Sequence, residues 1–249
     1  MDSLPQEIID EIIDNLPPSS LRSSSLVAKR WRTRSQQRTL CNIDFSDEFK
    51  VNQWYTYTHN DPGGIASYVQ SVEFKRVDKW QDPTLLGRVL ENFDSLTTLR
   101  ICKTIISDDM LEHISHGKLV QGITTLGLYC LQCSLSTLMS IILAFPNVQN
   151  LDISHLMTTP REAPSTYSAV SPRRPLESLA LREPANTEVT EVLASLQFTS
   201  RSLHLYAPPQ NIQKLLVLSS ATIVKLVLIG MCSLCVNRKI MLTTLQVHF

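Results

Sequence analysis

Residues 97–111 read Thr-Thr-Leu-Arg-Ile-Cys-Lys-Thr-Ile-Ile-Ser-Asp-Asp-Met-Leu, and this stretch decides the fold that the sequence predicts. Leu99 and Ile101 are separated by one variable residue, and such alternation over a short run predicts a strand with both apolar side chains on one face. The next stretch, 108–115, is compatible with a helix. A crossover helix between parallel strands is the expected unit, because a tight hairpin cannot connect parallel neighbours.

The same apolar pair recurs along the chain from residue 70 onward. Successive pairs begin 27, 27, 25, 28, 24, 23 and 19 residues apart. Most of these intervals lie in the range of leucine-rich repeats, roughly 20–29 residues. Further helix-compatible stretches lie between the pairs at 135–143, 188–196 and 212–218. The pairs are Val72/Phe74, Leu99/Ile101, Leu126/Leu128, Leu151/Ile153, Leu179/Leu181, Leu203/Leu205, Leu226/Leu228 and Leu245/Val247.

Residues 97–111 resemble one leucine-rich repeat, and the other repeats are looser. A regular Asn or Cys is missing at the turn position that follows the second apolar residue, so the sequence predicts an irregular solenoid without an Asn ladder. The residues at this position are Thr104, Leu131, Leu156, Pro184, Pro208 and Met231.

The first forty residues predict short helices with wide apolar faces. Ile8, Ile12 and Leu16 recur at helical spacing, and Pro17-Pro18 ends the pattern. A unit of about forty residues cannot bury so many large side chains internally, because surface dominates at that size. The segment therefore needs a partner surface, either in the same chain or in another protein.

Residues 3–40 resemble an F-box. The resemblance rests on Leu-Pro-Gln-Glu-Ile-Ile at 4–9, the Pro-Pro break at 17–18, and Ser-Leu-Val-Ala-Lys-Arg-Trp at 25–31, where many members carry Cys in place of Ala28. In the family this motif binds the Skp adaptor of Skp–cullin–F-box ubiquitin ligases. The adaptor contacts that the resemblance implies by position are Leu4, Pro5, Ile8, Ile12, Leu16, Leu26 and Val27. The alternative is an ordinary helical cap that buries its own apolar faces against the following domain.

Strand residues that alternate with the apolar pairs are the candidates for substrate binding. They share the opposite face of the sheet, and they mix aromatic side chains with both charge signs, as recognition surfaces do. An idle solvated face is the alternative. The candidates are Glu73, Arg100, Tyr129, Asp152, Arg182, His204 and Tyr206.

The expected architecture is α/β. A short all-α three-helix F-box at 1–40 and a linker at 41–68 precede an irregular leucine-rich-repeat-like solenoid with parallel strands at 69–249. The proline-rich interval 157–175 predicts a surface loop. The last apolar pair ends just before Phe249, so we expect either a truncated chain or a last segment that folds differently from a repeat.

The resemblance implies a substrate receptor, and no nucleophile–base pair predicts a catalytic activity. The six unevenly placed cysteines and the lack of a signal-like start predict reduced thiols in a cytoplasmic or nuclear protein. The partners of the receptor are a Skp-type adaptor, through it a cullin, and an unidentified target protein. One alternative is a repeat scaffold that never enters a ligase. Another is a protein anchored in a membrane through 215–236, although Lys225 near the centre of that segment costs roughly 3 kcal/mol on insertion. We therefore expect no membrane association.

Composition and motifs predict no nucleic-acid partner, metal, cofactor or catalytic group. The 23 basic and 23 acidic residues cancel, and the basic stretch at 29–38 is interpreted as a solvated helix face rather than a nuclear-import or nucleic-acid patch. The Cys-x-x-Cys pairs at 130/133 and 232/235 lie four repeats apart, roughly 19 Å, which is too far for one zinc ion. His113 and His116, near Glu112 and Asp109, have the spacing His-x-x-His rather than His-Glu-x-x-His, and no third ligand is apparent. We interpret them as a solvated helix face.

Overall fold

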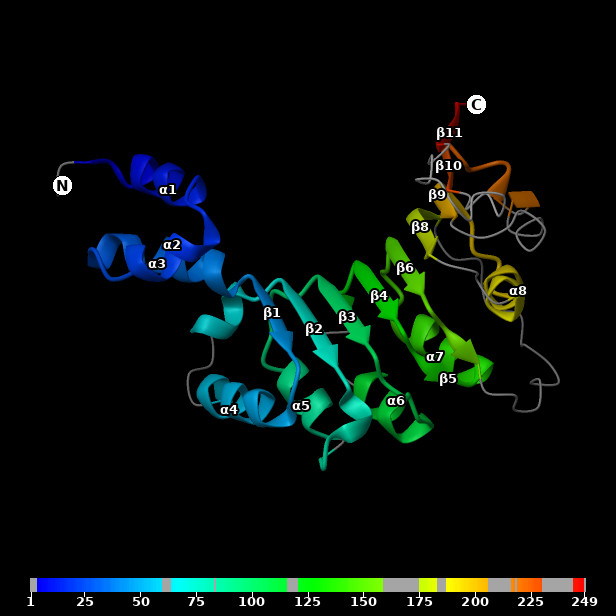
Figure 1. Cartoon of the computed structure of the whole chain (residues 1–249), viewed down its shortest axis with the longest axis horizontal. Coiled ribbons are helices and arrows are strands. Elements are labelled where there is room, and N and C mark those ends of the chain that lie inside the picture. The colour runs from blue at the N-terminus through cyan, green and yellow to red at the C-terminus, as the bar shows by residue number, and fades with distance from the viewer. Residues whose placement is uncertain are drawn as a thin grey trace, which may run out of the picture.

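A unit of three helices precedes a curved array of strands and helices in the computed structural model (Figure 1). The structure describes residues 4–59, 64–82, 84–115, 121–158, 175–182, 187–205, 216–217, 219–229 and 244–248. The α-helices are α1 (Gln6–Asp14), α2 (Pro18–Ser24), α3 (Lys29–Leu40), α4 (Glu48–His59), α5 (Leu85–Leu90), α6 (Asp108–Ser115), α7 (Leu135–Ala144) and α8 (Thr187–Ser195). Among the described residues, short 3-10 helices are η1 (Ile65–Tyr68) and η2 (Val77–Lys79).

The strands form one large sheet and one small one. The large sheet has nine strands in the order β1-β2-β3-β4-β6-β8-β9-β10-β11, and β5 pairs with β7 in the small sheet. The strands are β1 (Asn42–Phe45), β2 (Ser71–Lys75), β3 (Thr98–Cys102), β4 (Thr125–Tyr129), β5 (Gln132–Cys133), β6 (Asn150–Ser154), β7 (Met157–Thr158), β8 (Leu176–Arg182), β9 (Ser200–Leu205), β10 (Lys225–Ile229) and β11 (Thr244–His248). Neighbours from β1 to β10 are parallel, which confirms the predicted α/β fold with a parallel sheet.

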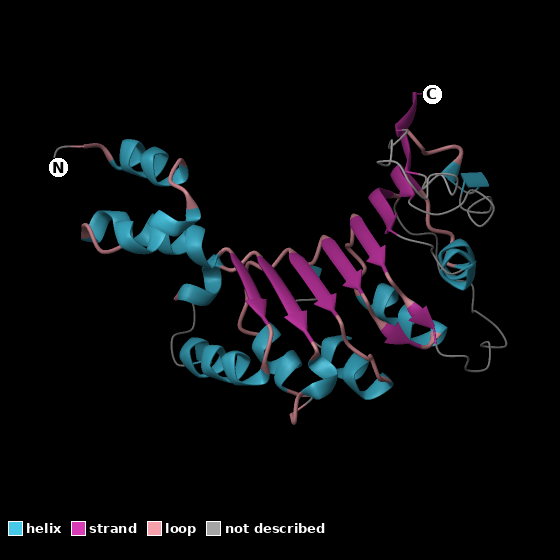
Figure 2. Cartoon of the chain, viewed as in Figure 1, coloured by secondary structure: helices cyan, strands magenta, loops and turns pink. Residues whose placement is uncertain are grey.

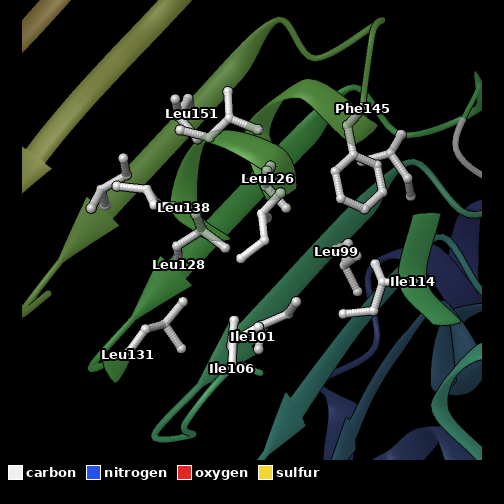
Figure 3. Close-up of a cluster of buried hydrophobic side chains, with 14 of the residues drawn as sticks. Leu99, Ile101, Ile106, Ile114, Leu126, Leu128, Leu131, Leu138, Phe145 and Leu151 are labelled. Carbon is white, nitrogen blue, oxygen red and sulfur yellow. The ribbon is translucent and has the colours of Figure 1, made fainter. Parts of the chain in front are cut away.

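The repeated apolar pairs form the core of the solenoid. Strand register places Leu99 beside Leu126 and Ile101 beside Leu128, so equivalent side chains stack from strand to strand. All four are fully buried. Figure 3 shows these strand residues packed against Ile114, Leu138 and Phe145 from the helical side. Because side chains alternate along each strand, the residue between the two members of an apolar pair points to the other face of the sheet.

The helices of the solenoid lie on one side of the sheet (Figure 2). Each of α4, α5, α6 and α7 contacts the next helix in the series, ending with α8. Within the described part of the chain, the opposite side of the sheet carries no helix. We call this side the open face; it consists of the strand residues that alternate with the buried apolar pairs.

The sheet begins and ends differently from the sequence pattern. β1 and α4 lie within 41–68, the interval interpreted as a linker, and β1 pairs in parallel with β2. At the other end β11 runs antiparallel to β10, with Leu226 opposite Val247. The last apolar pair is therefore not another parallel repeat. Residues 159–174, most of the predicted surface loop, lie outside the described residues.

A left-handed residue directly follows four successive parallel strands. Arg76, Lys103, Cys130 and His155 have φ angles between 51° and 55° and come after β2, β3, β4 and β6. The N–H of Lys103 donates to the carbonyl oxygen of Tyr129 at 2.8 Å, so the ladder extends by one bond while the chain turns. For residues other than Gly, this conformation costs about 1–2 kcal/mol, and the added backbone hydrogen bond offsets part of that cost.

Candidate functional site

The N-terminal helices have a small core of their own. Ile9 and Ile13 from α1 and Leu21 from α2 are buried together, and Leu16 and Trp31 pack against them. The hydroxyl groups of Ser24 and Ser35 share a buried 2.9 Å hydrogen bond between α2 and α3. This core uses one face of α1 and leaves the other face uncovered.

The uncovered face of α1 carries large apolar side chains. Ile8 is 42% exposed and Ile12 is 37% exposed, while Leu26 and Val27 in the turn before α3 are 77% and 57% exposed. Leu4 and Pro5 are also exposed. Such exposed apolar groups, gathered on one small unit, are typical of a protein-binding surface. We call Leu4, Ile8, Ile12, Leu26 and Val27 the exposed apolar set.

Leu16 differs from the other adaptor candidates. It is half-buried and packs against the core of the three helices, because it follows the end of α1 and turns inward. The sequence stripe Ile8, Ile12 and Leu16 is therefore divided, with two residues exposed and one structural. Ile8 and Ile12 stay exposed, so the described part of the chain does not provide the coverage that the helical-cap alternative requires.

Arginines of α3 hold α1 in place. Arg34 forms a bidentate contact with Asp14, with hydrogen bonds of 2.7 and 2.5 Å. Arg38 donates to the carbonyl oxygens of Ile13 and Leu16 at the end of α1. Arg34 lowers the pKa of the Asp14 carboxyl below its ordinary 3.8, chiefly through the side-chain hydrogen bond. Part of the basic stretch at 29–38 is thus structural rather than a free solvated face.

The helical unit joins the solenoid through α3. This helix contacts both η1 and β1, and a cavity of about 370 Å³ lies at the joint. Its lining includes Arg34 and Arg38, whose guanidinium groups are engaged by α1. The cavity is lined by Arg34, Gln37, Arg38, Cys41, Ser67, Tyr68 and Gln70.

The open face brings together six of the seven substrate candidates. Register places Arg100 between Glu73 and Gly127 on the neighbouring strands. The same row continues through Asp152, Ala180 and His204 on the next three strands. Tyr129 and Arg182 occupy the neighbouring row on the same face. Tyr206 lies outside the described residues. The structure therefore locates these six residues on one surface, and their role in binding stays a prediction.

Tyr129 is the centre of a hydrogen-bonded group on this face. Its hydroxyl donates to Asp152 at 2.9 Å, and Arg182 binds the same carboxylate at 3.0–3.1 Å. Burial, together with the negative charge of Asp152, raises the pKa of Tyr129 to about 12, although a hydrogen bond with Arg100 opposes the rise. Arg100 also donates to the Ser71 hydroxyl at 3.1 Å.

Gly127 makes room for the Tyr129 ring. A Cβ atom built on Gly127 would lie 2.7 Å from the ring carbon Cε2 and 2.9 Å from the hydroxyl oxygen. The ring therefore lies across the glycine and spans the gap between β4 and β6. Alternation places Gly127 on the open face, but without a side chain it did not stand out as a site residue.

The two edges of the open face differ in charge. On the β1–β2 side, Lys75 forms ion pairs with Asp44 and Glu73. On the β8–β10 side, burial lowers the pKa of His204 below its ordinary 6.5, and the charges of Lys225 and Arg182 add to this shift. Lys225 is exposed and precedes the last parallel apolar pair by one residue, a position that the alternation pattern also assigns to this face.

Two of the described cysteines, Cys102 and Cys133, are buried thiols with raised pKa values. Burial raises the pKa of Cys133 to about 11, and burial with the nearby Glu73 charge raises that of Cys102 to about 12. A thiol in this range stays protonated near neutral pH and is a poor nucleophile. Cys41, Cys102, Cys130 and Cys133 are free thiols. Cys232 and Cys235 lie outside the described residues.

The described residues contain no cluster of three His, Cys, Asp or Glu side chains with metal-binding geometry; His116 is not among them. In the same ranges, no helix combines the length and apolar character needed to cross a bilayer. Within 215–236, residues 225–229 form strand β10.

Comparison with protein families identifies residues 1–41 as an F-box domain. No curated protein matches the chain. Among solved structures, a match is the tropomodulin C-terminal domain of Caenorhabditis elegans, with 9% sequence identity and a TM-score of 0.36 over 69% of this chain and 92% of that one. The F-box match covers α1, α2 and α3 together with the exposed apolar set.

Proposed function

We propose that the chain is the substrate-receptor subunit of a Skp–cullin–F-box ubiquitin ligase. The single observation that carries the proposal is the division of α1 into two faces. Ile9 and Ile13 hold the F-box together, while Ile8 and Ile12 stay exposed for a partner. Burying an exposed apolar side chain of this size contributes roughly 1.5–3 kcal/mol, so the set as a whole supports a stable complex with the Skp-type adaptor.

The solenoid supplies the second half of the proposed function. Its open face presents charged and aromatic side chains within one sheet, and the α3 contacts with η1 and β1 connect that sheet to the F-box. A target protein bound there is held at a set distance from the adaptor and the cullin. The chain itself performs no chemistry; effective concentration near the ubiquitin carrier promotes transfer.

Gel filtration of the purified chain with a Skp-type adaptor and a cullin tests the proposal. We expect the wild-type chain to elute with both partners. The Ile8→Asp/Ile12→Asp double variant is expected to elute alone, since two buried charges oppose docking. Lys50→Asp is the matched control, because Lys50 is exposed on α4, away from the F-box.

If the wild-type chain elutes alone, the ligase assignment is wrong. In that case the chain would be a repeat scaffold that acts outside any ligase. If the double variant elutes with the adaptor as well as the wild type does, the exposed apolar set is not the docking surface. Circular dichroism of the double variant establishes that its helices are intact.

A further inference from the structure

Most of the described side chains on the open face are polar. One row of register partners crosses the sheet near the N-terminal ends of the strands. It carries small polar side chains from β1 to β9 and a lysine at β10: Asn42, Ser71, Thr98, Thr125, Asn150, Ser178, Ser202 and Lys225. In the central row, the described apolar side chains are those of Ala180 and Val227, and Val227 is buried. A partner on this face is therefore recognised by hydrogen bonds and charge more than by apolar burial.

Positive charge dominates the face beyond β2. The carboxylates of Asp44 and Glu73 on β1 and β2 are neutralised in part by Lys75. From β3 onward the face carries Arg100, Arg182 and Lys225 against the single carboxylate of Asp152 among the described residues. Since Arg182 pairs with Asp152, the excess charge lies at the two ends of this region.

Arg100 and Lys225 are the cations at those two ends. Arg100 is half-buried, and its hydrogen bonds go to the neutral hydroxyls of Ser71 and Tyr129. Within the described ranges neither Arg100 nor Lys225 forms an ion pair. A half-buried guanidinium bonded only to neutral groups retains its attraction for an anion, and a carboxylate or phosphate is the group that it binds most strongly.

The sequence reinforces the positive end. Residues 192–249 contain no Asp or Glu side chain and five Lys or Arg residues. Arg201, one of these five, pairs with Glu177 from outside the segment, and Lys225 is the other basic residue of the segment that the structure describes.

We infer that the open face between β3 and β10 binds an extended acidic peptide segment, with one anionic side chain on Arg100 and another near Lys225. The inference rests on the proposed function and names the class of target that the receptor would hold. Five strand intervals separate β3 from β10, a span of roughly 24 Å at about 4.8 Å per strand. An extended peptide covers this span with about seven residues, at about 3.3 Å each.

Carboxylates on the face favour a peptide over a nucleic acid. Asp152 lies between the two cations, and a polyanionic backbone crossing the sheet would place a phosphate against it. A peptide avoids this repulsion with uncharged residues between two acidic ones. The aromatic ring of Tyr129 is also held by Asp152 and is not free to stack on a base.

Fluorescence anisotropy on the complex of the full chain with its Skp-type adaptor tests the inference. The probes are labelled peptides of about ten residues, each with two Glu residues at varied spacing in a Ser/Gly background. Matched sets carry phosphoserine or Lys in place of Glu, and a single-stranded oligonucleotide is a further probe. We expect Glu or phosphoserine peptides to bind, best near the seven-residue spacing, and the stronger of the two identifies the anion. Added salt weakens this binding.

Two variants and a control separate the outcomes. Arg100→Met and Lys225→Met should each weaken peptide binding about tenfold or more, while Lys50→Met on α4 leaves it unchanged. If an adaptor complex forms but neither acidic peptide set binds, or if only the oligonucleotide binds, the inference is wrong and the proposed function stands. Equal affinity for Lys peptides, or unchanged affinity in both variants, likewise overturns it. Failure of the adaptor complex itself counts against the proposed function instead.

Discussion

The hydroxyl of Tyr129 on β4 donates a 2.9 Å hydrogen bond to the carboxylate of Asp152 on β6. The bond joins neighbouring strands on the open face, and Arg182 binds the same carboxylate from β8. Three strands are thus connected by side chains as well as by the backbone ladder. The arrangement depends on Gly127, since any Cβ there would meet the Tyr129 ring.

Gly127→Ala should displace the Tyr129 ring and weaken its bond to Asp152. Both causes of the raised pKa, burial and the Asp152 charge, then decrease, so the pKa should fall from about 12 toward the ordinary 10. Ultraviolet titration of tyrosinate in the variant, compared with Tyr129→Phe, isolates this group. If the high-pH titration step is the same in Gly127→Ala and the wild type, the ring does not depend on the glycine.

Stability of the wild type should also decline in strong alkali because of Tyr129. The folded-state pKa lies above the unfolded value of about 10, so the folded chain holds the proton more tightly. The contribution of this group is complete below pH 10 and is lost as the pH rises from about 10 to 12. The free energy of unfolding measured with urea should fall less steeply across this pH range in Tyr129→Phe than in the wild type. Equal slopes would contradict the raised pKa.

The two faces of α1 should respond differently to substitution. Ile13→Ala removes a side chain that is fully buried in the F-box core and should cost about 2–5 kcal/mol of its stability. Ile12→Ala removes an exposed side chain, and we expect less than about 0.5 kcal/mol. Local unfolding is followed by hydrogen exchange at α1 amides. Equal losses would contradict the division of α1 into one buried face and one exposed face.

The ion pair between Arg34 and Asp14 should be visible in the titration of Asp14. Its pKa should lie below 3.8 and return toward that value in Arg34→Met, because the hydrogen bond from Arg34 is the largest cause of the shift. The pair's contribution is present above pH 3.8 and is lost as the pH falls through the lowered pKa. Carboxyl NMR titration measures the shift. If the pKa of Asp14 is the same in the wild type and in Arg34→Met, the pair does not form in solution.

His204 should titrate below its ordinary 6.5, chiefly because it is partly buried, with Lys225 and Arg182 adding to the effect. Protonation therefore opposes folding, and stability falls as the pH drops from 6.5 toward the lowered pKa. In Lys225→Met the imidazole pKa should move back up. Proton NMR of the imidazole ring reports both values, and a pKa above 6.5 in the wild type would contradict the charge distribution on this edge of the sheet.

Strand alternation predicted most of the solenoid because the buried pairs are strong local signals. Leu99/Ile101 and Leu126/Leu128 became β3 and β4 in register, and the helical stretch at 108–115 became α6. β1 escaped prediction because Ile43 and Phe45 come before the first repeat interval, without a preceding pair to set a period. β11 reversed direction because an apolar pair specifies a face and not a strand direction.

The site was predictable in outline, and its contacts were not. Alternation assigned Arg100, Tyr129 and Asp152 to one face, but only the register showed which of them meet. The division of the 8–12–16 stripe depended on where α1 ends, since Leu16 turns into the core once the helix stops at Asp14. The turns at Lys103 and Cys130 have left-handed backbone conformations, but neither residue is a glycine, so the sequence did not mark them.

Site-specific photocrosslinking tests the central claim most directly. A photoreactive amino acid is placed at Ile12 in the exposed apolar set, or at Met157, which is exposed on β7 of the solenoid. After mixing with a Skp-type adaptor and irradiation, the account predicts a crosslink to the adaptor from position 12 and none from position 157. A chain that crosslinks equally from both positions, or from neither while the two proteins still co-elute, would contradict adaptor docking on this face of α1.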